Sequence, residues 1–244
     1  MRGMMRNLIR AWVVAVLGLV AAAPAGAAQL RVEPLTVEVV APGAAATLTL
    51  RNDSATEANV QIRVFRWSQS EGREILEPTT DVVASPPAVK MSPGRDYVAR
   101  LVRVAKRPVV GEEAYRIFVD QLPEPVQGRL STVNLLIRYS IPAFFIEQPG
   151  TAPAVKWSVA LDQGRIMFAA QNLGYRRLRL SSVRLRDASG ATISFGNGLL
   201  GYVLAQSTMS WTASGPPRAF GNAVSISAES DQGPIHAEVS GPAR

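Results

Sequence analysis

The residues that could carry catalytic or metal chemistry are few and scattered in this chain of 244 residues. It has no cysteine and one histidine, His236. A Ser-His-Asp triad would have to use that histidine, and nothing near it resembles a nucleophile elbow. Metal sites need clusters of histidine, cysteine or carboxylate side chains, and the sequence shows none. We therefore predict no enzyme activity, no cofactor, no metal and no disulfide, and a solvated strand position for His236.

Three short motifs match functional patterns by letter alone. "GNGLLG" (196–201) fits a dinucleotide-binding fingerprint, which needs a preceding strand and a following helix; a hairpin connection fits the β-rich context better. "NDS" (52–54) fits a glycosylation acceptor, but its side chains also favour a plain turn. Glu112 and Glu113 follow Gly111, which favours a solvated loop over a carboxylate pair for acid–base chemistry.

One arginine stands out because of the strand that contains it. "STVNLLIRYSIPAFF" (131–145) is rich in β-branched and aromatic residues and carries Arg138 in its middle. In a regular strand Val133, Leu135 and Ile137 share one face and Arg138 lies on the other. Such a strand is either buried on both faces or has an exposed edge that can accept a partner strand.

The first 27 residues predict a secretory signal peptide. A basic start with Arg2, Arg6 and Arg10 leads into a short apolar run and a small-residue end, Ala25-Gly26-Ala27, which is the order of such a peptide. A membrane anchor is the alternative, but the apolar run 11–23 is short for a span of about 20 residues. We expect an exported chain with no membrane span after the signal peptide.

The charge of the chain does not indicate a nucleic-acid partner. The formal net charge is +7, and three of the arginines lie in the signal peptide. We find no stripe of lysine and arginine interleaved with aromatic residues, which nucleic-acid binding would favour.

The remaining chain predicts an all-β fold. Short alternating or β-branched runs are separated by proline, glycine and other turn residues, a pattern typical of β-sandwiches. Near "FFIEQPGTAP" (144–153), Gln148-Pro149-Gly150 and Pro153 indicate a linker, and we divide the chain into residues 28–148 and residues 149–244, one sandwich each. The predicted strands are 30–40, 45–52, 59–67, 97–105, 113–122, 131–145, 156–161, 164–172, 176–187, 190–196, 201–211, 223–230 and 235–241.

The order of motifs over residues 30–146 resembles a known family. "LTLRND", "VQIRVFRWSQSEGREILEPTTDVVASPP", "SPGRDYVARLVRV", "AYRIFVDQLPEP" and "LLIRYSIPAFF" follow one another as in the periplasmic chaperones of the bacterial chaperone–usher pilus pathway, most closely its archaic, spore-coat-like branch. The resemblance implies two immunoglobulin-like domains in an L or boomerang shape. It also implies pilus subunits and an outer-membrane usher as partners, and location in the periplasm.

The resemblance also implies roles for individual residues. Chaperones of this family lend an edge strand to a subunit that lacks one, and two basic residues in the cleft hold the subunit's terminal carboxylate. Val133, Leu135 and Ile137 then match the donated side chains, and Arg138 matches a basic anchor. The preceding loop (122–131) resembles the variable loop of the family.

The second basic anchor departs from the family pattern. Thr36, in "EPLTV", occupies the position where the family carries a basic residue in its first strand. Arg31 is near in sequence but on the other face of a regular strand. Three explanations are open at this point. Arg31 replaces the missing basic residue through a bulge in the strand, Arg138 acts as the only anchor, or the chain is a divergent member of the family.

Three other functions are weighed against the chaperone. An exported module for a carbohydrate or small ligand would group exposed aromatic residues on one face, whereas Trp67, Trp157 and Trp211 are scattered in contexts that favour core packing. A secreted hydrolase would need a catalytic group of histidine, cysteine or carboxylate side chains, which this sequence does not show. A pilus subunit would have one incomplete domain rather than two complete ones.

Overall fold

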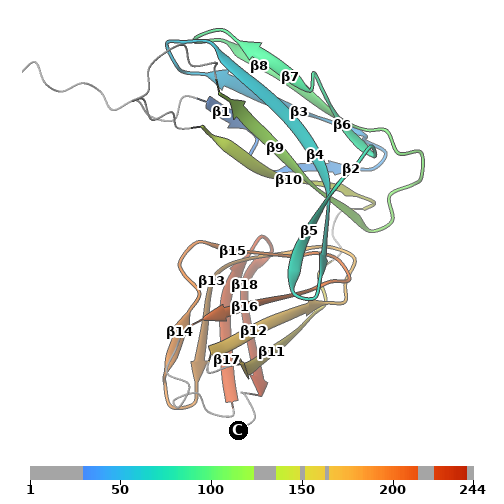
Figure 1. Cartoon of the computed structure of the whole chain (residues 1–244). Helices are drawn as coiled ribbons and strands as arrows, with labels where there is room; N and C mark the ends of the chain where they lie inside the picture. The colour runs from blue at the N-terminus through green and yellow to red at the C-terminus, as the bar shows by residue number, and fades with distance from the viewer. Residues whose placement is uncertain (1–29, 124–135, 149–151, 163–164, 214–222, 241–244) are drawn as a thin grey trace, which may run out of the picture.

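The computed structural model describes residues 30–123, 136–148, 152–162, 165–213 and 223–240. Within these ranges the chain forms eighteen strands and no helix, so no helix there could cross a membrane. Figure 1 shows two β-sandwiches that meet at one side and diverge at an angle. The all-β prediction with two sandwiches is confirmed, while the predicted signal peptide lies outside the described residues.

The first sandwich consists of two sheets (Figure 1). One sheet has the order β1-β3-β8-β6, and the other has the order β2-β10-β9-β4-β5 with β7 also paired to β4. The strands are β1 (Leu30–Glu33), β2 (Val37–Val40), β3 (Ala45–Asn52), β4 (Ala58–Ser70), β5 (Arg73–Pro78), β6 (Val82–Ser85), β7 (Ala88–Met91), β8 (Asp96–Arg103), β9 (Glu112–Leu122) and β10 (Arg138–Ile146).

The alternation of side chains along β9 explains how this sandwich closes. Tyr115, Ile117 and Val119 are fully buried in the core between the two sheets, because every second side chain of a strand points to the same face. The residues between them, among them Arg116 and Phe118, lie on the opposite face of the sheet. That opposite face is turned toward the second domain.

The second sandwich also has two sheets and its own core. Their orders are β11-β12-β16 and β14-β13-β17-β18, with β15 paired to β13. Its largest buried side chain, Phe168, stacks against Trp157 and Trp211. The strands are β11 (Val155–Asp162), β12 (Arg165–Asn172), β13 (Leu178–Asp187), β14 (Thr192–Ser194), β15 (Leu199–Val203), β16 (Thr208–Ala213), β17 (Ala223–Ser230) and β18 (Gly233–Ser240).

The predicted strands are confirmed in type within the described residues, but the strand predicted at 131–145 begins only at Arg138, and two others are divided. The run 30–40 breaks at Pro34, and its halves join different sheets, since β1 pairs with β3 while β2 pairs in parallel with β10. The run 201–211 is also two strands, β15 and β16, separated by a turn that contains Gln206 at a positive φ. Proline supplies no backbone N–H to a ladder, which suits a change of sheet at Pro34.

A third cluster of buried side chains joins the two domains. Trp67, Ala114, Phe144 and Ile146 of the first domain pack against Tyr202 and Leu204 of the second. The β4–β5 hairpin extends from the first sandwich onto the second (Figure 1), where Gly72 forms a bridge with Met209. Gln69 of that hairpin donates to the carbonyl of Tyr202 and accepts from the backbone N–H of Leu204, both at 2.8 Å. These contacts set the orientation of the domains.

Candidate functional site

The first half of β10 has a backbone edge that no strand covers within the described chain. Strand β9 pairs with β10 along its whole length, but β2 pairs only with residues 143–146. The carbonyl of Ile137 accepts the N–H of Gln121 on β9 at 3.0 Å. Backbone groups of successive residues point to opposite sides, so those of Arg138 and Ser140 point to the open side. An unpaired row of this kind can accept another strand.

Of the predicted donor side chains, the structure describes Ile137 only. Ile137 is partly buried and has the same parity as Tyr139 and Ile141, which pack in the core. Val133 and Leu135 lie outside the described residues, as does most of the loop at 122–131. Their roles remain predictions.

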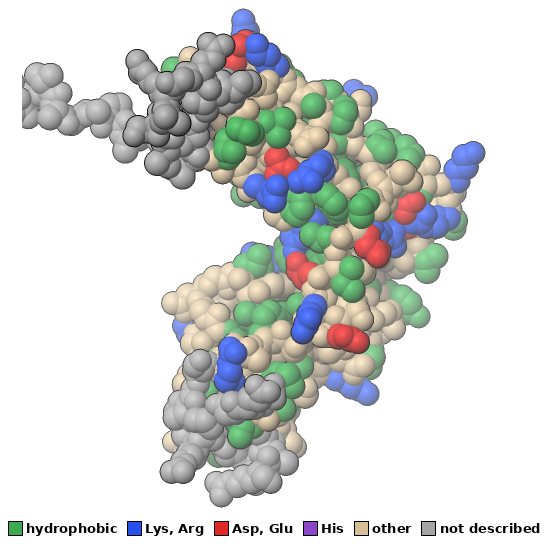
Figure 2. Space-filling view, in the orientation of Figure 1, with side chains coloured by type: hydrophobic (Ala, Val, Ile, Leu, Met, Phe, Trp, Pro, Cys, Tyr) green, Lys and Arg blue, Asp and Glu red, His purple; other side chains and the backbone are tan. Residues whose placement is uncertain are grey.

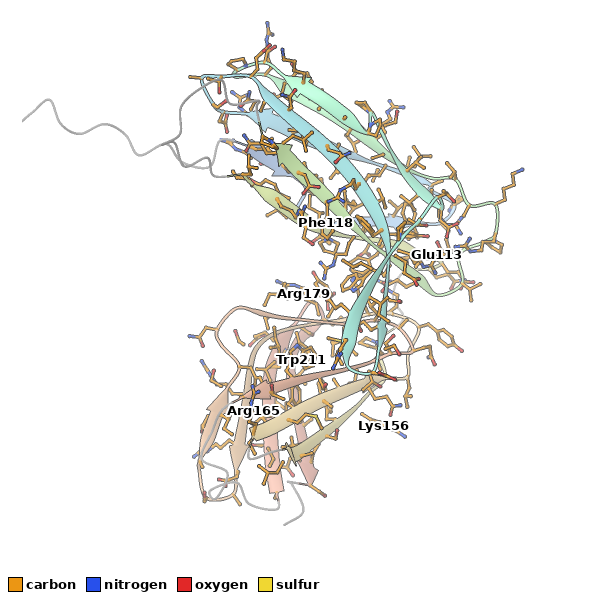
Figure 3. The ribbon with its side chains drawn as sticks, viewed as in Figure 1. Glu113, Phe118, Lys156, Arg165, Arg179 and Trp211 are labelled. Carbon is orange, nitrogen blue, oxygen red and sulfur yellow. The ribbon has the colours of Figure 1, made fainter. Side chains whose placement is uncertain are left out.

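The face of the sheet beside this edge forms one wall of an open notch between the domains (Figure 2). Cross-strand register places Arg63 beside Phe118, Phe65 and Pro142 beside Arg116, and Arg138 beside Asp120. Residues directly opposite in an antiparallel pair point to the same face. Figure 3 shows Phe118 pointing into the notch. We call this notch, with its wall of aromatic and arginine side chains, the cleft.

Arg138 lies at the outer end of the cleft and is 60% exposed. It is ion-paired with Asp120 and lies over the ring of Phe118. Arg63 holds the same carboxylate at 3.0 and 2.8 Å. Burial raises the pKa of Asp120, but the hydrogen bonds from Arg138 and Arg63 outweigh it and hold that pKa below its ordinary value. Arg138 is therefore accessible but already paired with a carboxylate.

Arg116, which was not singled out from the sequence, lies deeper in the cleft. Its side chain is 13% exposed, and its guanidinium carbon is 3.7 Å from the centroid of a Trp67 ring. Its one ion-pair partner in the described chain is Glu74, at 3.1 Å. Arginine has five N–H donors, and within the described ranges the hydrogen bond of Arg116 to Glu74 uses one of them, which leaves donors that can bind a further anion. The sequence did hold a signal for Arg116. In the predicted strand 113–122, this arginine lies on the same face as Phe118 and Asp120.

The two candidates for the second basic anchor are not brought together with Arg138. Arg31 lies on β1, between the buried residues Leu30 and Val32, so it faces outward from the other sheet. There it pairs with Asp53 at 2.7 Å. Thr36 is exposed just before β2 and carries no charge.

Glu112 and Glu113 are buried, so the prediction of a solvated loop was wrong. The side chain of Glu112 is 1% exposed and binds Arg177 at 2.5 Å and Arg176 at 3.0 Å, while Arg177 also binds Glu38 at 2.5 Å. Burial raises the pKa of Glu112 although both arginines oppose that effect. This network lies in the joint between the domains, where it links Glu38 and Glu112 of the first domain to two arginines of the second.

Glu113 points into the first domain, to a different set of partners. Arg103 holds it at 2.9 Å, and the hydroxyl of Tyr115 donates to it at 2.9 Å. Burial raises the pKa of Glu113, but these hydrogen bonds outweigh it and hold the value below the ordinary one. Burial and the same hydrogen bond raise the pKa of Tyr115 to about 12.

The remaining motifs found in the sequence have structural roles. The side chain of Asn52 is buried, donates to the carbonyls of Thr56 and Met91 and accepts from the N–H of Ser54, which confirms the turn prediction for 52–54. His236 is exposed on β18, as predicted. The glycine-rich run (196–201) follows β14 and includes the first three residues of β15, with no helix after it. No group of three metal-ligating side chains occurs in the ranges that the structure describes.

Comparison with known proteins identifies the family. Residues 29–149 match the model of the pili and flagellar-assembly chaperones, PapD N-terminal domain. Among curated proteins, none matches the sequence of the chain. The chain thus belongs to the pilus-assembly chaperones of the chaperone–usher pathway, and it acts as a chaperone of pilus biogenesis.

Three solved structures illustrate the likeness. The chaperone of the CsuC–CsuE chaperone–tip adhesion subunit pre-assembly complex, from the archaic Csu pili of Acinetobacter baumannii, is 27% identical, with a TM-score of 0.68 over 88% of this chain and 99% of that one. The match in the SafA pilin–SafB chaperone complex of Salmonella enterica is 18% identical, with a TM-score of 0.59 over 88% of this chain and 98% of that one. The E. coli chaperone DraB is 19% identical, with a TM-score of 0.59 over 86% of this chain and 98% of that one. The last two show the shared fold alone.

Proposed function

We propose that this chain is a periplasmic chaperone that captures a pilus subunit by adding strand β10 to the subunit's incomplete sheet and delivers it to an outer-membrane usher. The observation that carries the proposal is the uncovered edge of β10 at residues 138–142, beside a cleft lined with arginines. The archaic relative in complex with a tip adhesion subunit supports the choice of partner. The predicted signal peptide and the family resemblance support the location and the usher.

Strand addition suits the chemistry of this edge. Main-chain hydrogen bonds supply affinity, and alternate side chains supply specificity and register. Arg138 and Ser140 offer their backbone groups to the incoming strand, while Pro142 has no N–H to offer. We infer that Val133, Leu135 and Ile137 supply the apolar side chains that enter the subunit.

We infer that Arg116 is the principal anchor for the subunit's terminal carboxylate. It lies opposite Pro142, at the end of the uncovered edge nearest the joint between the domains. Arg138 is four residues farther out on β10, a distance of about 13 Å at the rise of a strand. Guanidinium and carboxylate form charge-assisted, often bidentate pairs. Arg138 then lines the path of the incoming strand and, through Asp120, fixes the outer wall of the cleft.

The structure does not favour the alternative of a carbohydrate or small-ligand module. Trp67 is fully buried between the domains, and Trp157 and Trp211 stack on the core residue Phe168. A sugar-binding face would need such rings grouped and exposed. The tryptophans thus have packing roles, as the sequence predicted.

Co-expression in the bacterial periplasm tests the proposal. The chaperone would be produced with subunits of the pilus encoded beside it, and a stable 1:1 complex should co-purify. Arg116→Glu should abolish the complex, and Arg138→Glu should weaken it. Arg100→Glu makes the same charge change on an exposed residue of β8, away from the cleft, and should leave the complex intact. Equal yields for Arg116→Glu and Arg100→Glu would refute the anchor, and no complex with any subunit would refute the function.

A further inference from the structure

Arg179 of the second domain faces the cleft from the wall opposite Arg116. On β13 its neighbours Leu178 and Leu180 are buried in the core of the second sandwich, so Arg179 points outward. It pairs across the strands with Tyr202 of β15, whose ring packs in the joint between the domains. Figure 3 shows Arg179 at the rim of the second domain, on the side of the first domain.

Arg116 and Arg179 approach the same tyrosine from different domains. The guanidinium carbon of Arg116 is 5.8 Å from the ring centroid of Tyr202. Directly opposite residues of an antiparallel pair have Cβ atoms about 5 Å apart, which places the stem of Arg179 beside the stem of Tyr202. The side chain of an arginine is long enough to reach past the ring. Tyr202 itself is buried, so a small anion held between the two arginines, beside this residue, would contact both guanidinium groups.

The charges around Arg179 favour an anion that is not part of this chain. Arg179 is partly buried, yet within the described ranges it has no hydrogen bond and no ion pair. Arg177, two residues earlier, holds the carboxylates of Glu112 and Glu38, and Glu74 is engaged by Arg116. A partly desolvated cation without a counter-charge raises the free energy of the unbound protein. A carboxylate that binds there relieves this cost.

We propose that Arg179 is the second anchor for the terminal carboxylate of the captured subunit, so that this carboxylate bridges the two domains. The inference rests on the proposed function and answers which residue replaces the basic side chain missing at Thr36. It also makes the second domain a direct part of the binding site. The contacts that set the domain orientation, such as Gln69 with β15, then also set the distance between the two anchors.

The test measures binding of one pilus subunit in two forms, with its native C-terminus and with a short Gly-Ser extension that displaces the carboxylate. Arg179→Gln should weaken binding of the native form by about tenfold or more, the range expected for a lost hydrogen-bonded charge. It should not change the already weakened binding of the extended form. Arg179→Lys should restore part of the loss because it keeps the charge.

Arg186→Gln is the matched control. Arg186 is exposed on the same strand, seven residues or about 23 Å from Arg179, and its loss should not change binding. Equal affinities for Arg179→Gln and Arg186→Gln, while Arg116→Gln still weakens binding, would overturn the role of Arg179 alone. An unsubstituted chaperone that binds neither form of the subunit would overturn the proposed function together with this inference.

Discussion

The guanidinium of Arg116 lies over the ring system of Trp67, with its central carbon 3.7 Å from a ring centroid. This contact joins the candidate anchor to the packing between the domains, because Trp67 also packs against Phe144 and Tyr202. A cation over an aromatic face in a partly desolvated position gains roughly 1–2 kcal/mol. The position of the anchor is therefore coupled to the joint between the domains.

Trp67→Ala should both destabilise the protein and weaken subunit binding. Trp67 is 2% exposed, and removal of a buried tryptophan costs about 3–5 kcal/mol of unfolding free energy. Urea unfolding measures that loss. Trp67→Phe keeps an aromatic face for Arg116 and should retain more binding than Trp67→Ala. The same binding by both variants, at temperatures where both are folded, would contradict the link between the ring and the anchor.

Asp120→Asn should lower stability at neutral pH and have less effect in acid. The folded-state pKa of Asp120 lies below its ordinary value, so the carboxylate stabilises the fold above the unfolded-state pKa of about 4. This contribution is lost as the pH falls through the folded-state pKa. We expect a difference of about 1–2 kcal/mol at pH 7 that shrinks toward pH 3. Urea unfolding across this pH range measures it, and a difference that grew in acid would contradict the assignment.

Arg177→Leu should be strongly destabilising because it removes the main partner of the buried Glu112. Breaking a buried ion pair on one side costs about 3–5 kcal/mol, whereas replacing both partners by apolar residues costs much less. The double variant Arg177→Leu/Glu112→Leu should therefore be more stable than Arg177→Leu alone. Thermal and urea unfolding of the three proteins provide the comparison. A double variant less stable than the single one would show that the network does more than neutralise Glu112.

Alternating strands could be predicted from the sequence because alternation reports which side chains are buried. The strand at 113–122 shows this well, since its odd-numbered residues from Tyr115 to Val119 form the core. Strand β5 was missed for the same reason. All six of its residues are exposed, so the sequence carries no alternation there. The division of 30–40 between two sheets depends on pairing with β3 and β10, which no local pattern specifies.

The candidate site could be predicted only in part. The strand with the free edge was found because an arginine among apolar residues is visible in the sequence. The burial of Glu112 could not be predicted, because its partners Arg176 and Arg177 are more than 60 residues away in the sequence and belong to the second domain. Arg116 lies near the ring of Tyr202 and Arg179 is the cross-strand partner of Tyr202, a relationship that exists only once both domains are folded and joined.

Hydrogen exchange of the β10 amides, measured by NMR with and without a bound subunit, tests strand addition most directly. The N–H groups of Arg138 and Ser140 point to the uncovered side, and those of Tyr139 and Ile141 point to β9. The account predicts that subunit binding strongly slows exchange at Arg138 and Ser140, while Tyr139 and Ile141 are protected in both states. Unchanged exchange at Arg138 and Ser140 in a confirmed complex would contradict capture through this edge.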